Sequence, residues 1–270
     1  MTGWVSRGLA LTAVVAFLAT GCGGPASSAP EPTAGTVVRI AAASDLRFAL
    51  EEVADLVKSE HPDVELAVTY GSSGQFVQQI GNGAPFDLFL SADLAYPEQL
   101  VDEGLAESGD VFSYGIGRLV LWAAEESSVD PREGLAVLAD PAVRTVAIAN
   151  PEHAPYGRAA VEALRSAGVW DVVEPKLVLG ENVSQAADFV RSGNADAGVV
   201  ALSLVLASSA KDEGRWAEVP LELFSPLEQG GVVLAGARDP AATRAVRDVL
   251  TGEEGRAVLA SYGFSPADRA

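Results

Sequence analysis

The chain has 270 residues, 49% of them hydrophobic and 20% charged, and a formal net charge of −19. This size allows one large domain or two modest ones. The acidity argues against nucleic acid or an anionic membrane surface as a partner, because both are bound by clusters of Lys and Arg.

The first 21 residues have the composition of a signal peptide. An apolar run covers residues 8–18, and three small residues then precede Cys22, the only cysteine. The run is shorter than the roughly 20 apolar residues of a spanning helix. A small residue before a cysteine resembles a bacterial lipobox, although Ala19 stands where a larger aliphatic residue is usual. We expect export and lipidation of Cys22, with an ordinary cleaved signal as the alternative.

Residues 22–36 are predicted to be a lipidated tether. They contain three prolines and lack a periodic apolar pattern, as flexible linkers do. The expected location is the outer face of the bacterial cytoplasmic membrane, or the periplasm, with the lipid as the sole membrane contact.

From residue 37 onward, short apolar runs alternate with amphipathic stretches. The first half predicts strands at 37–42, 64–69 and 87–90, and helices that begin at Ser44, Ser73 and Leu94. After an apolar run at 117–123, the second half predicts strands at 145–149, 177–179, 197–201 and 231–235, and helices at 157–167, 183–191, 240–250 and 253–262. Repeated βα units indicate parallel, doubly wound α/β sheets.

The last strand and the last two helices need a sheet edge on which to dock. We expect them to return to the first lobe, which makes lobe I residues 37–117 plus 225–270 and lobe II residues 118–224. The predicted fold is therefore two doubly wound α/β lobes joined by a hinge of two crossings, near Gly117 and Gly230.

Candidate binding residues lie where strands end and helices begin. Ligands of parallel α/β sheets bind at the carboxyl ends of the strands, where the first amides of a helix lack partners. Such corners occur at 41–46 with Ser44, at 69–75 with Ser72 and Ser73, at 150–158 with Tyr156, and at 180–184 with Val183. Taken alone, Ser44 is better explained as a helix N-cap than as a binding residue.

A serine hydrolase is disfavoured by the same residues. Gly71 and Gly74 are too close for a Gly-x-Ser-x-Gly turn, and the chain has only two histidines, His61 and His153. His153 is interpreted as bracing its loop. We therefore expect no catalytic residue, no resident metal and no cofactor.

As a set, several motifs resemble the molybdate-binding proteins of ABC transporters, which are extracytoplasmic solute-binding proteins. The motifs are Ala41-Ala42-Ala43-Ser44, Tyr70-Gly71-Ser72-Ser73-Gly74, Gln78-Gln79-Ile80, the stretch from Gly83 to Asp93, the stretch from Asn150 to Gly157, and Tyr262-Gly263-Phe264. The resemblance implies a type II periplasmic-binding-protein fold, molybdate or tungstate as ligand, and an ABC permease as partner. Nothing in the sequence argues against a monomer.

The resemblance also implies site residues. The family's oxyanion contacts correspond to Ser44, Ser73, Tyr156 and Val183, with Ser72 as a secondary candidate. At Ala201 many members have a tyrosine, so a donor is missing there, and Tyr156 is hypothesised to replace it.

Asp45 bears on selectivity. Phosphate keeps a proton at neutral pH and can be recognised by a carboxylate, whereas molybdate, tungstate and sulfate would be repelled. We expect Asp45 to point outward in a first helical turn, where a negative charge is favourable. The alternatives left open are a binding protein for phosphate, sulfate or a small organic anion, and a structural or adhesive lipoprotein.

Overall fold

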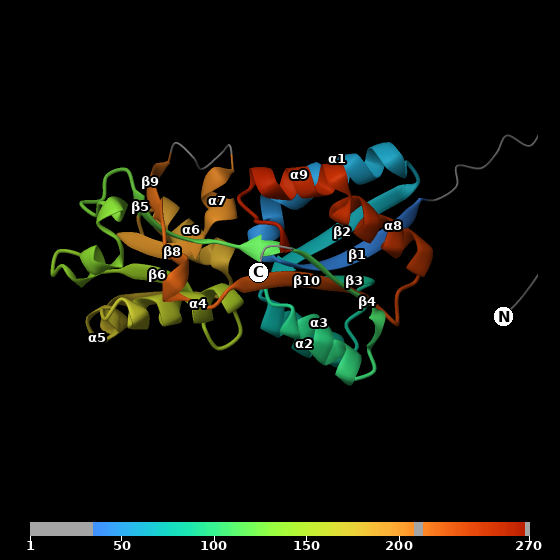
Figure 1. Ribbon diagram of the computed structural model, residues 1–270, viewed down its shortest axis with the longest axis horizontal. Helices are drawn as coiled ribbons and strands as arrows, with labels where there is room; N and C mark the ends of the chain where they lie inside the picture. The colour runs from blue at the N-terminus through green and yellow to red at the C-terminus, as the bar shows by residue number, and fades with distance from the viewer. Residues whose placement is uncertain (1–34, 208–212, 268–270) are drawn as a thin grey trace, which may run out of the picture. The chain divides into compact units, whose positions relative to one another are not determined.

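A computed structural model describes residues 35–207 and 213–267, which form two five-stranded sheets (Figure 1). The expected signal peptide, the lipidation site Cys22 and all but the last two residues of the expected tether lie outside the described residues. None of the described helices is long and apolar enough to cross a membrane.

The first sheet has the strand order β2-β1-β3-β10-β4. The strands are β1 Thr36–Ala43, β2 Val64–Gly71, β3 Leu88–Ser91, β4 Ala106–Gly117 and β10 Leu227–Leu234. β1 pairs in parallel with β2 and β3, and β10 runs antiparallel to β3 and β4.

Five helices cover this sheet, with α1, α8 and α9 on one face and α2 and α3 on the other (Figure 1). Their bounds are α1 Arg47–Glu60, α2 Ser73–Gly81, α3 Ala95–Asp102, α8 Pro240–Thr251 and α9 Glu253–Ser261. A single 3-10 turn, η1 Ser44–Leu46, joins β1 to α1, so the α-helix predicted from Ser44 begins three residues later.

The second sheet has the strand order β7-β6-β8-β5-β9. The strands are β5 Leu119–Ala124, β6 Val146–Ala149, β7 Leu177–Gly180, β8 Ala197–Ala201 and β9 Gly214–Glu218. β6 is parallel to β7 and β8, and β5 is antiparallel to β8 and β9. Its helices are α4 Pro155–Ser166, α5 Trp170–Val173, α6 Val183–Arg191 and α7 Leu202–Leu206, with short 3-10 helices η2 Pro131–Glu133, η3 Leu135–Ala139, η4 Glu174–Lys176 and η5 Leu221–Leu223.

The chain passes between the sheets twice. Only Arg118 separates β4 from β5, and residues 219–226 connect β9 to β10, so Gly230 lies inside β10. The prediction of two α/β lobes joined by two crossings is therefore confirmed. The strands of the first three βα units are parallel as predicted, and β10 and β5 make both sheets mixed by running antiparallel to their neighbours.

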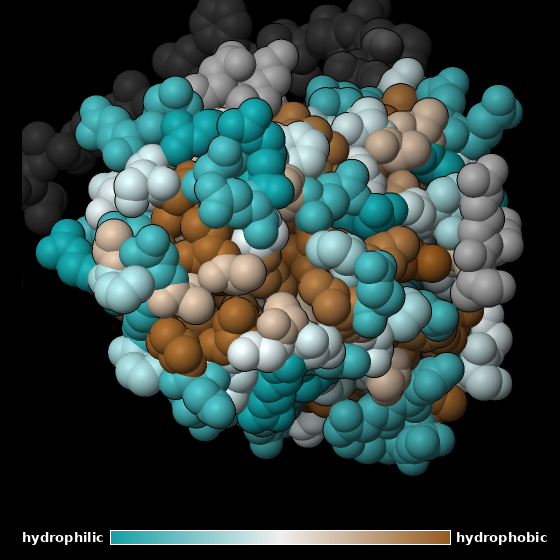
Figure 2. Space-filling view, turned by 60° about the vertical axis from the view of Figure 1, so that its left-hand side comes forward, coloured by the Kyte–Doolittle hydropathy of each residue, from teal (hydrophilic) through white to brown (hydrophobic). Residues whose placement is uncertain are grey.

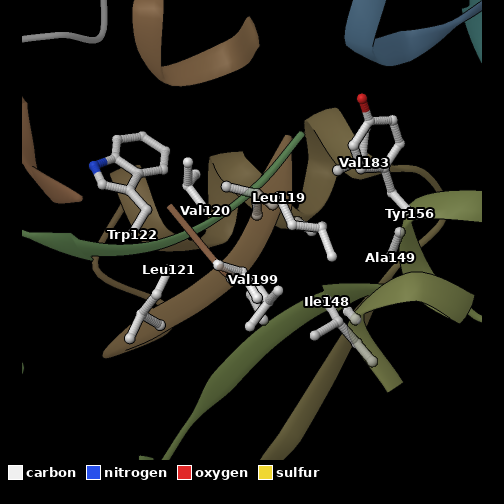
Figure 3. Close-up of a cluster of buried hydrophobic side chains, with 14 of the residues drawn as sticks. Leu119, Val120, Leu121, Trp122, Ile148, Ala149, Tyr156, Val183 and Val199 are labelled. Carbon is white, nitrogen blue, oxygen red and sulfur yellow. The ribbon is translucent and has the colours of Figure 1, made fainter. Parts of the chain in front are cut away.

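Each lobe has its own hydrophobic core. In the first lobe, one cluster lies on the face covered by α1, α8 and α9, and a second on the face of α2 and α3. The core of the second lobe includes Trp122, Ile148 and Val199 (Figure 3). Tyr156 and Val183 lie side by side at the edge of this cluster, so packing against the core fixes both side chains (Figure 3).

Apolar surface is also gathered on the second lobe. Figure 2, in which that side of the molecule comes forward, shows hydrophobic residues concentrated near the middle of the face with hydrophilic residues around them. Large hydrophobic side chains that remain about half exposed here include Val172, Leu179 and Leu221.

Candidate functional site

Residues of both lobes surround one small cavity at the line where the lobes meet. Its volume is about 10 Å³, roughly the space that one water molecule needs, and it is lined by Ala43, Ser44, Asp45, Gly71, Ser72, Ser73, Ala92, Ala154, Pro155, Tyr156, Asn182 and Val183. These residues come from the strand-to-helix corners that follow β1, β2, β3, β6 and β7. In the part of the chain that the structure describes, this lining includes no Lys, Arg or His side chain. The potential donors in the lining are therefore hydroxyls, backbone amides and the side-chain amide of Asn182.

The corner after β1 presents Ser44, which is 2% exposed. Its Oγ accepts a hydrogen bond from the backbone amide of Ser184 in the other lobe at 3.2 Å, and Ser184 Oγ donates to the carbonyl of Ser44 at 2.9 Å. Ala43, not Ser44, is the N-cap of this short helix, so the explanation of Ser44 as an N-cap is not supported. Because its Oγ acts here as an acceptor, the Ser44 hydroxyl proton is available to another acceptor.

The corner after β2 presents two serines with different partners. Ser73 Oγ accepts a hydrogen bond from the backbone amide of Ala92 at 3.0 Å, which fixes the oxygen and leaves its proton to donate elsewhere. Ser72 Oγ instead donates to the backbone carbonyl of His153 in the other lobe at 2.6 Å. Ser73 is thus free to donate into the cavity, while Ser72 joins the lobes.

The second lobe contributes the first turns of α4 and α6. Helix α4 approaches the end of β6 closely, because a Cβ on Gly157 would lie 2.2 Å from the carbonyl oxygen of Ala149. This approach brings Tyr156 to the cavity. At α6, the Asn182 side chain caps the helix by accepting from the Gln185 amide at 3.1 Å, so Val183 is the first helical residue. The amide of Val183 has no acceptor within its own helix.

The expected outward orientation of Asp45 is wrong. Its side chain is 1% exposed and lines the cavity, and its Oδ2 accepts from Gln229 Nε2 at 2.7 Å. Burial raises the pKa of Asp45 to about 6, although the hydrogen bond from Gln229 and the nearby Tyr156 hydroxyl lower it in part. The short 3-10 turn explains the error, since Asp45 precedes α1 and is enclosed between the lobes rather than standing on a helix surface.

Gln229 connects Asp45 to two tyrosines from different lobes. Its Nε2 also donates to Tyr156 Oη at 2.9 Å, and its Oε1 accepts from Tyr114 Oη at 2.9 Å. All four side chains are buried. Burial raises the pKa of both tyrosines well above the usual value, and the charge of Asp45 acts in the same direction. Both phenols are therefore neutral donors at ordinary pH.

Gln229, Tyr114 and Ser203 were not predicted as parts of this region, and Ser184 lies in a predicted corner but was given no role. Ser184 pairs with Ser44, and Ser203 Oγ donates to the Asp45 carbonyl at 2.7 Å. A lone glutamine within the apolar segment of β10 was a usable signal for Gln229. The serines carried no comparable signal, because their contacts depend on how the lobes meet.

Ala201 lies at the end of β8 and is fully buried. It is not among the residues that line the cavity, whereas Tyr156 is.

Further contacts join the lobes around the cavity. The Gly74 amide donates to the His153 carbonyl at 3.0 Å, and Gln75 Nε2 donates to Glu181 Oε2 at 2.9 Å. On another side, Arg158 Nη2 bonds Asp93 Oδ2 at 2.6 Å. The structure therefore represents a closed arrangement of the lobes.

The one serine–histidine contact among the described residues does not form an activated nucleophile. Ser72 donates its proton to the His153 backbone carbonyl, so the ring Nδ1, 2.9 Å from Ser72 Oγ, must be the donor in that contact. To act as a general base, the ring nitrogen would instead have to accept the proton of the Ser72 hydroxyl. Among the described residues, no group of three or more His, Cys, Asp or Glu side chains could hold a metal ion.

Residues 38–265 match the protein family described as bacterial extracellular solute-binding protein. The chain belongs to this family, and its two lobes have the type II fold of periplasmic binding proteins.

Within the family, the chain is similar to molybdate-binding proteins of ABC transporters, as its motifs indicated. It is 39% identical to molybdate-binding protein ModA of Rhodobacter capsulatus over 233 residues, and this aligned region covers 86% of this chain and 90% of that protein. It is 37% identical over 227 residues to ModA of Azotobacter vinelandii, covering 84% and 89%. The solved periplasmic molybdate-binding protein of Azotobacter vinelandii matches with a TM-score of 0.79 at 32% identity, covering 85% of this chain and 99% of that one. A sulfate-binding protein of Mycobacterium tuberculosis, at 16% identity and a TM-score of 0.71, shares the fold alone.

Proposed function

We propose that this protein captures molybdate or tungstate between its lobes and delivers it to an ABC importer. The observation that carries the proposal is the buried cavity, lined from both lobes by uncharged donors and by no described Lys or Arg. The similarity to molybdate-binding proteins over most of the chain gives the anion its identity.

The proposed contacts are the hydroxyl and backbone amides at Ser44 and Ser73, the amide of Val183, and Tyr156. A charge-assisted hydrogen bond contributes about 1.5–3 kcal/mol. A helix N-terminus adds about 0.3–1 kcal/mol. A nanomolar complex requires about 12 kcal/mol, so about six such bonds to a dianion in a closed, dry cavity are sufficient.

Tyr156 is proposed to supply the donor that is missing at Ala201. Its Oη accepts from Gln229 Nε2, so its own proton remains available to donate. In support, Tyr156 lines the cavity and is fixed at the edge of the core of the second lobe.

The rest of the proposed assignment concerns the whole chain. Residues 1–21 act as a signal peptide and Cys22 as a lipidation site, with residues 22–36 as a tether. Lobe I comprises 37–117 plus 225–270, and lobe II comprises 118–224. The protein acts as a monomer, without a cofactor and without enzymatic activity, outside the cytoplasmic membrane.

The test is the melting temperature of the protein with molybdate, tungstate, sulfate, phosphate and chromate in parallel. A ligand at 100 times its Kd stabilises the folded state by about 2.7 kcal/mol. Molybdate and tungstate should therefore raise the melting temperature by several degrees. Replacement of both Ser44 and Ser73 by Ala should abolish this rise while the protein without ligand stays folded.

Ser261→Ala, at an exposed position at the end of α9, is the matched control and should leave the rise intact. A larger rise with phosphate or sulfate than with molybdate would refute the proposed ligand. No response to any of the five anions would refute capture of an oxyanion altogether.

A further inference from the structure

Asp45 stands out because one of its two carboxyl oxygens has no partner. Oδ2 accepts from Gln229, but Oδ1, in a side chain only 1% exposed, makes no hydrogen bond to any described residue. The main chain of Asp45 is held in place, since Ser203 Oγ donates to its carbonyl at 2.7 Å. Asp45 lines the cavity together with Ser44, Ser73, Tyr156 and Val183.

An ionised carboxylate in this position conflicts with an anionic guest. A buried oxygen without a hydrogen bond costs about 1–3 kcal/mol, and more when it is charged. A dianion in the same small cavity adds repulsion that water cannot screen once the lobes are closed. Protonation removes both costs, because it turns an unsatisfied acceptor into a donor.

We propose that Asp45 takes up one proton from solvent when the lobes close on the oxyanion, so that the carboxyl group donates to the bound anion. This inference rests on the function proposed above and assigns to Asp45 control of its pH dependence. The step is an acid–base equilibrium only: the carboxylate gains a proton from water, and no bond to the anion is formed or broken.

The neighbouring groups leave Asp45 as the site of the proton. Of the side chains around it, Gln229 and Ser203 do not titrate, and burial raises the pKa values of Tyr114 and Tyr156 well above 10. Other titratable side chains lie in the contact between the lobes, where His153 Nε2 is 3.9 Å from Glu181 Oε2. In the closed structure, burial already raises the pKa of Asp45 to about 6.

The direction of the pH effect follows from linkage. An anion in the cavity favours the protonated carboxyl, so the pKa of Asp45 is higher in the complex than in the free protein. Affinity is then highest where Asp45 is already protonated and falls as pH rises between the two pKa values. The maximum slope for uptake of one proton is about tenfold in Kd per pH unit.

The experiment is calorimetric titration with molybdate between pH 6.5 and 8.5, in two non-phosphate buffers of different ionisation enthalpy. The wild-type protein should take up close to one proton per anion near pH 7.5, and its affinity should fall several-fold to tenfold per pH unit. Asp45→Asn should take up no proton and bind with an affinity independent of pH. The new amide can accept from Gln229 through its oxygen and donate into the cavity through its nitrogen.

Ser44→Ala is the matched control: it should weaken binding at every pH and leave the slope unchanged. Tight wild-type binding without proton uptake would overturn this inference and leave the proposed function standing. If the affinity of Asp45→Asn depended on pH as strongly as that of the wild-type protein, another group would take up the proton. That result would also overturn this inference. Should that variant not fold, Asp45→Ser tests the same point. Tighter binding of phosphate, without proton uptake, would overturn both proposals, because phosphate brings its own proton.

Discussion

At the scale of single residues, Gly117 lets the two lobes share a buried contact. It ends β4, immediately before the first crossing. A Cβ there would lie 2.3 Å from Tyr156 Oη and 2.5 Å from Gln229 Nε2. Real Cβ atoms do not approach other atoms so closely, so a side chain at residue 117 must displace the tyrosine–glutamine pair that contacts Asp45.

Gly117→Ala should therefore reduce molybdate affinity at least tenfold and lower the free energy of unfolding by about 1–3 kcal/mol, as overpacking does. Titration calorimetry and chemical denaturation measure the two effects. Gly109→Ala in the same strand is the control, because a Cβ there meets no described atom within 4 Å. Equal affinities of the two variants would contradict the role given to Gly117.

Asp45 also predicts a pH-dependent stability in the absence of ligand. Its pKa is raised from 3.8 to about 6, so the folded state must either hold the proton or bear a buried charge. The free-energy cost of the buried charge begins as pH rises above the pKa of Asp45 in the unfolded state, near 4. It reaches its full size above about pH 6. Asp45→Asn should thus be the more stable protein above pH 6, by at most about 3 kcal/mol, and the difference should vanish near pH 4. Denaturation of both proteins at pH 4 and 7.5 checks this, and a difference that does not change with pH would contradict it.

At the scale of elements, the first turn of α2 forms part of the contact between the lobes. The Gly74 amide donates to the His153 carbonyl, and a Cβ on Gly74 would lie 2.7 Å from that oxygen and 2.8 Å from Tyr96 Oη. The absence of a side chain at Gly74 therefore allows the second lobe to approach the start of this helix.

Gly74→Ala should hinder closure and reduce molybdate affinity at least tenfold, while the melting temperature without ligand changes little. Gly81→Ala, at the other end of the same helix, is the control, since its Cβ would meet only Glu103 Oε2, at the ordinary distance of 3.7 Å. Binding measured by calorimetry should be unaffected in Gly81→Ala. Wild-type affinity in Gly74→Ala would show that closure does not require this approach.

The elements also show what the sequence could predict. Strands such as β6 and β8 were found because all their residues are buried and apolar. β4 and β9 were missed because they are edge strands with mixed polar composition, and α5 and α7 because they are only four and five residues long. The corners with Ser44, Ser73, Tyr156 and Val183 were located from their places after strands. The burial of Asp45 and its contact with Gln229 were not, because they depend on residues 184 positions apart.

At the scale of the whole molecule, closure joins the lobes through polar contacts on several sides of the cavity. One of them, between Arg158 and Asp93, pairs side chains that are 41% and 33% exposed. Ion pairs with such exposure contribute about 0–1 kcal/mol. Because such contacts contribute little, we expect closure to depend mainly on the proposed anion between the lobes.

Small-angle scattering should accordingly show a smaller radius of gyration with saturating molybdate than without it. Arg158→Ala should still compact, with a Kd raised no more than about fivefold, because a single partly exposed ion pair is lost. This account of closure would be contradicted if the radius of gyration of the wild-type protein did not fall with molybdate. It would also be contradicted if the decrease were lost in Arg158→Ala.

The polar character of the contact between the lobes also bears on how a solute leaves. When the lobes separate, water can replace each hydrogen bond, such as that from Gln75 to Glu181, at a net cost of about 0.5–1.5 kcal/mol. A transporter that binds both lobes thus has to supply only the free energy needed to break a few such hydrogen bonds. The water that enters as the lobes separate also hydrates the donors around the cavity. Opening of the lobes should therefore weaken the binding of the proposed anion from its first stage.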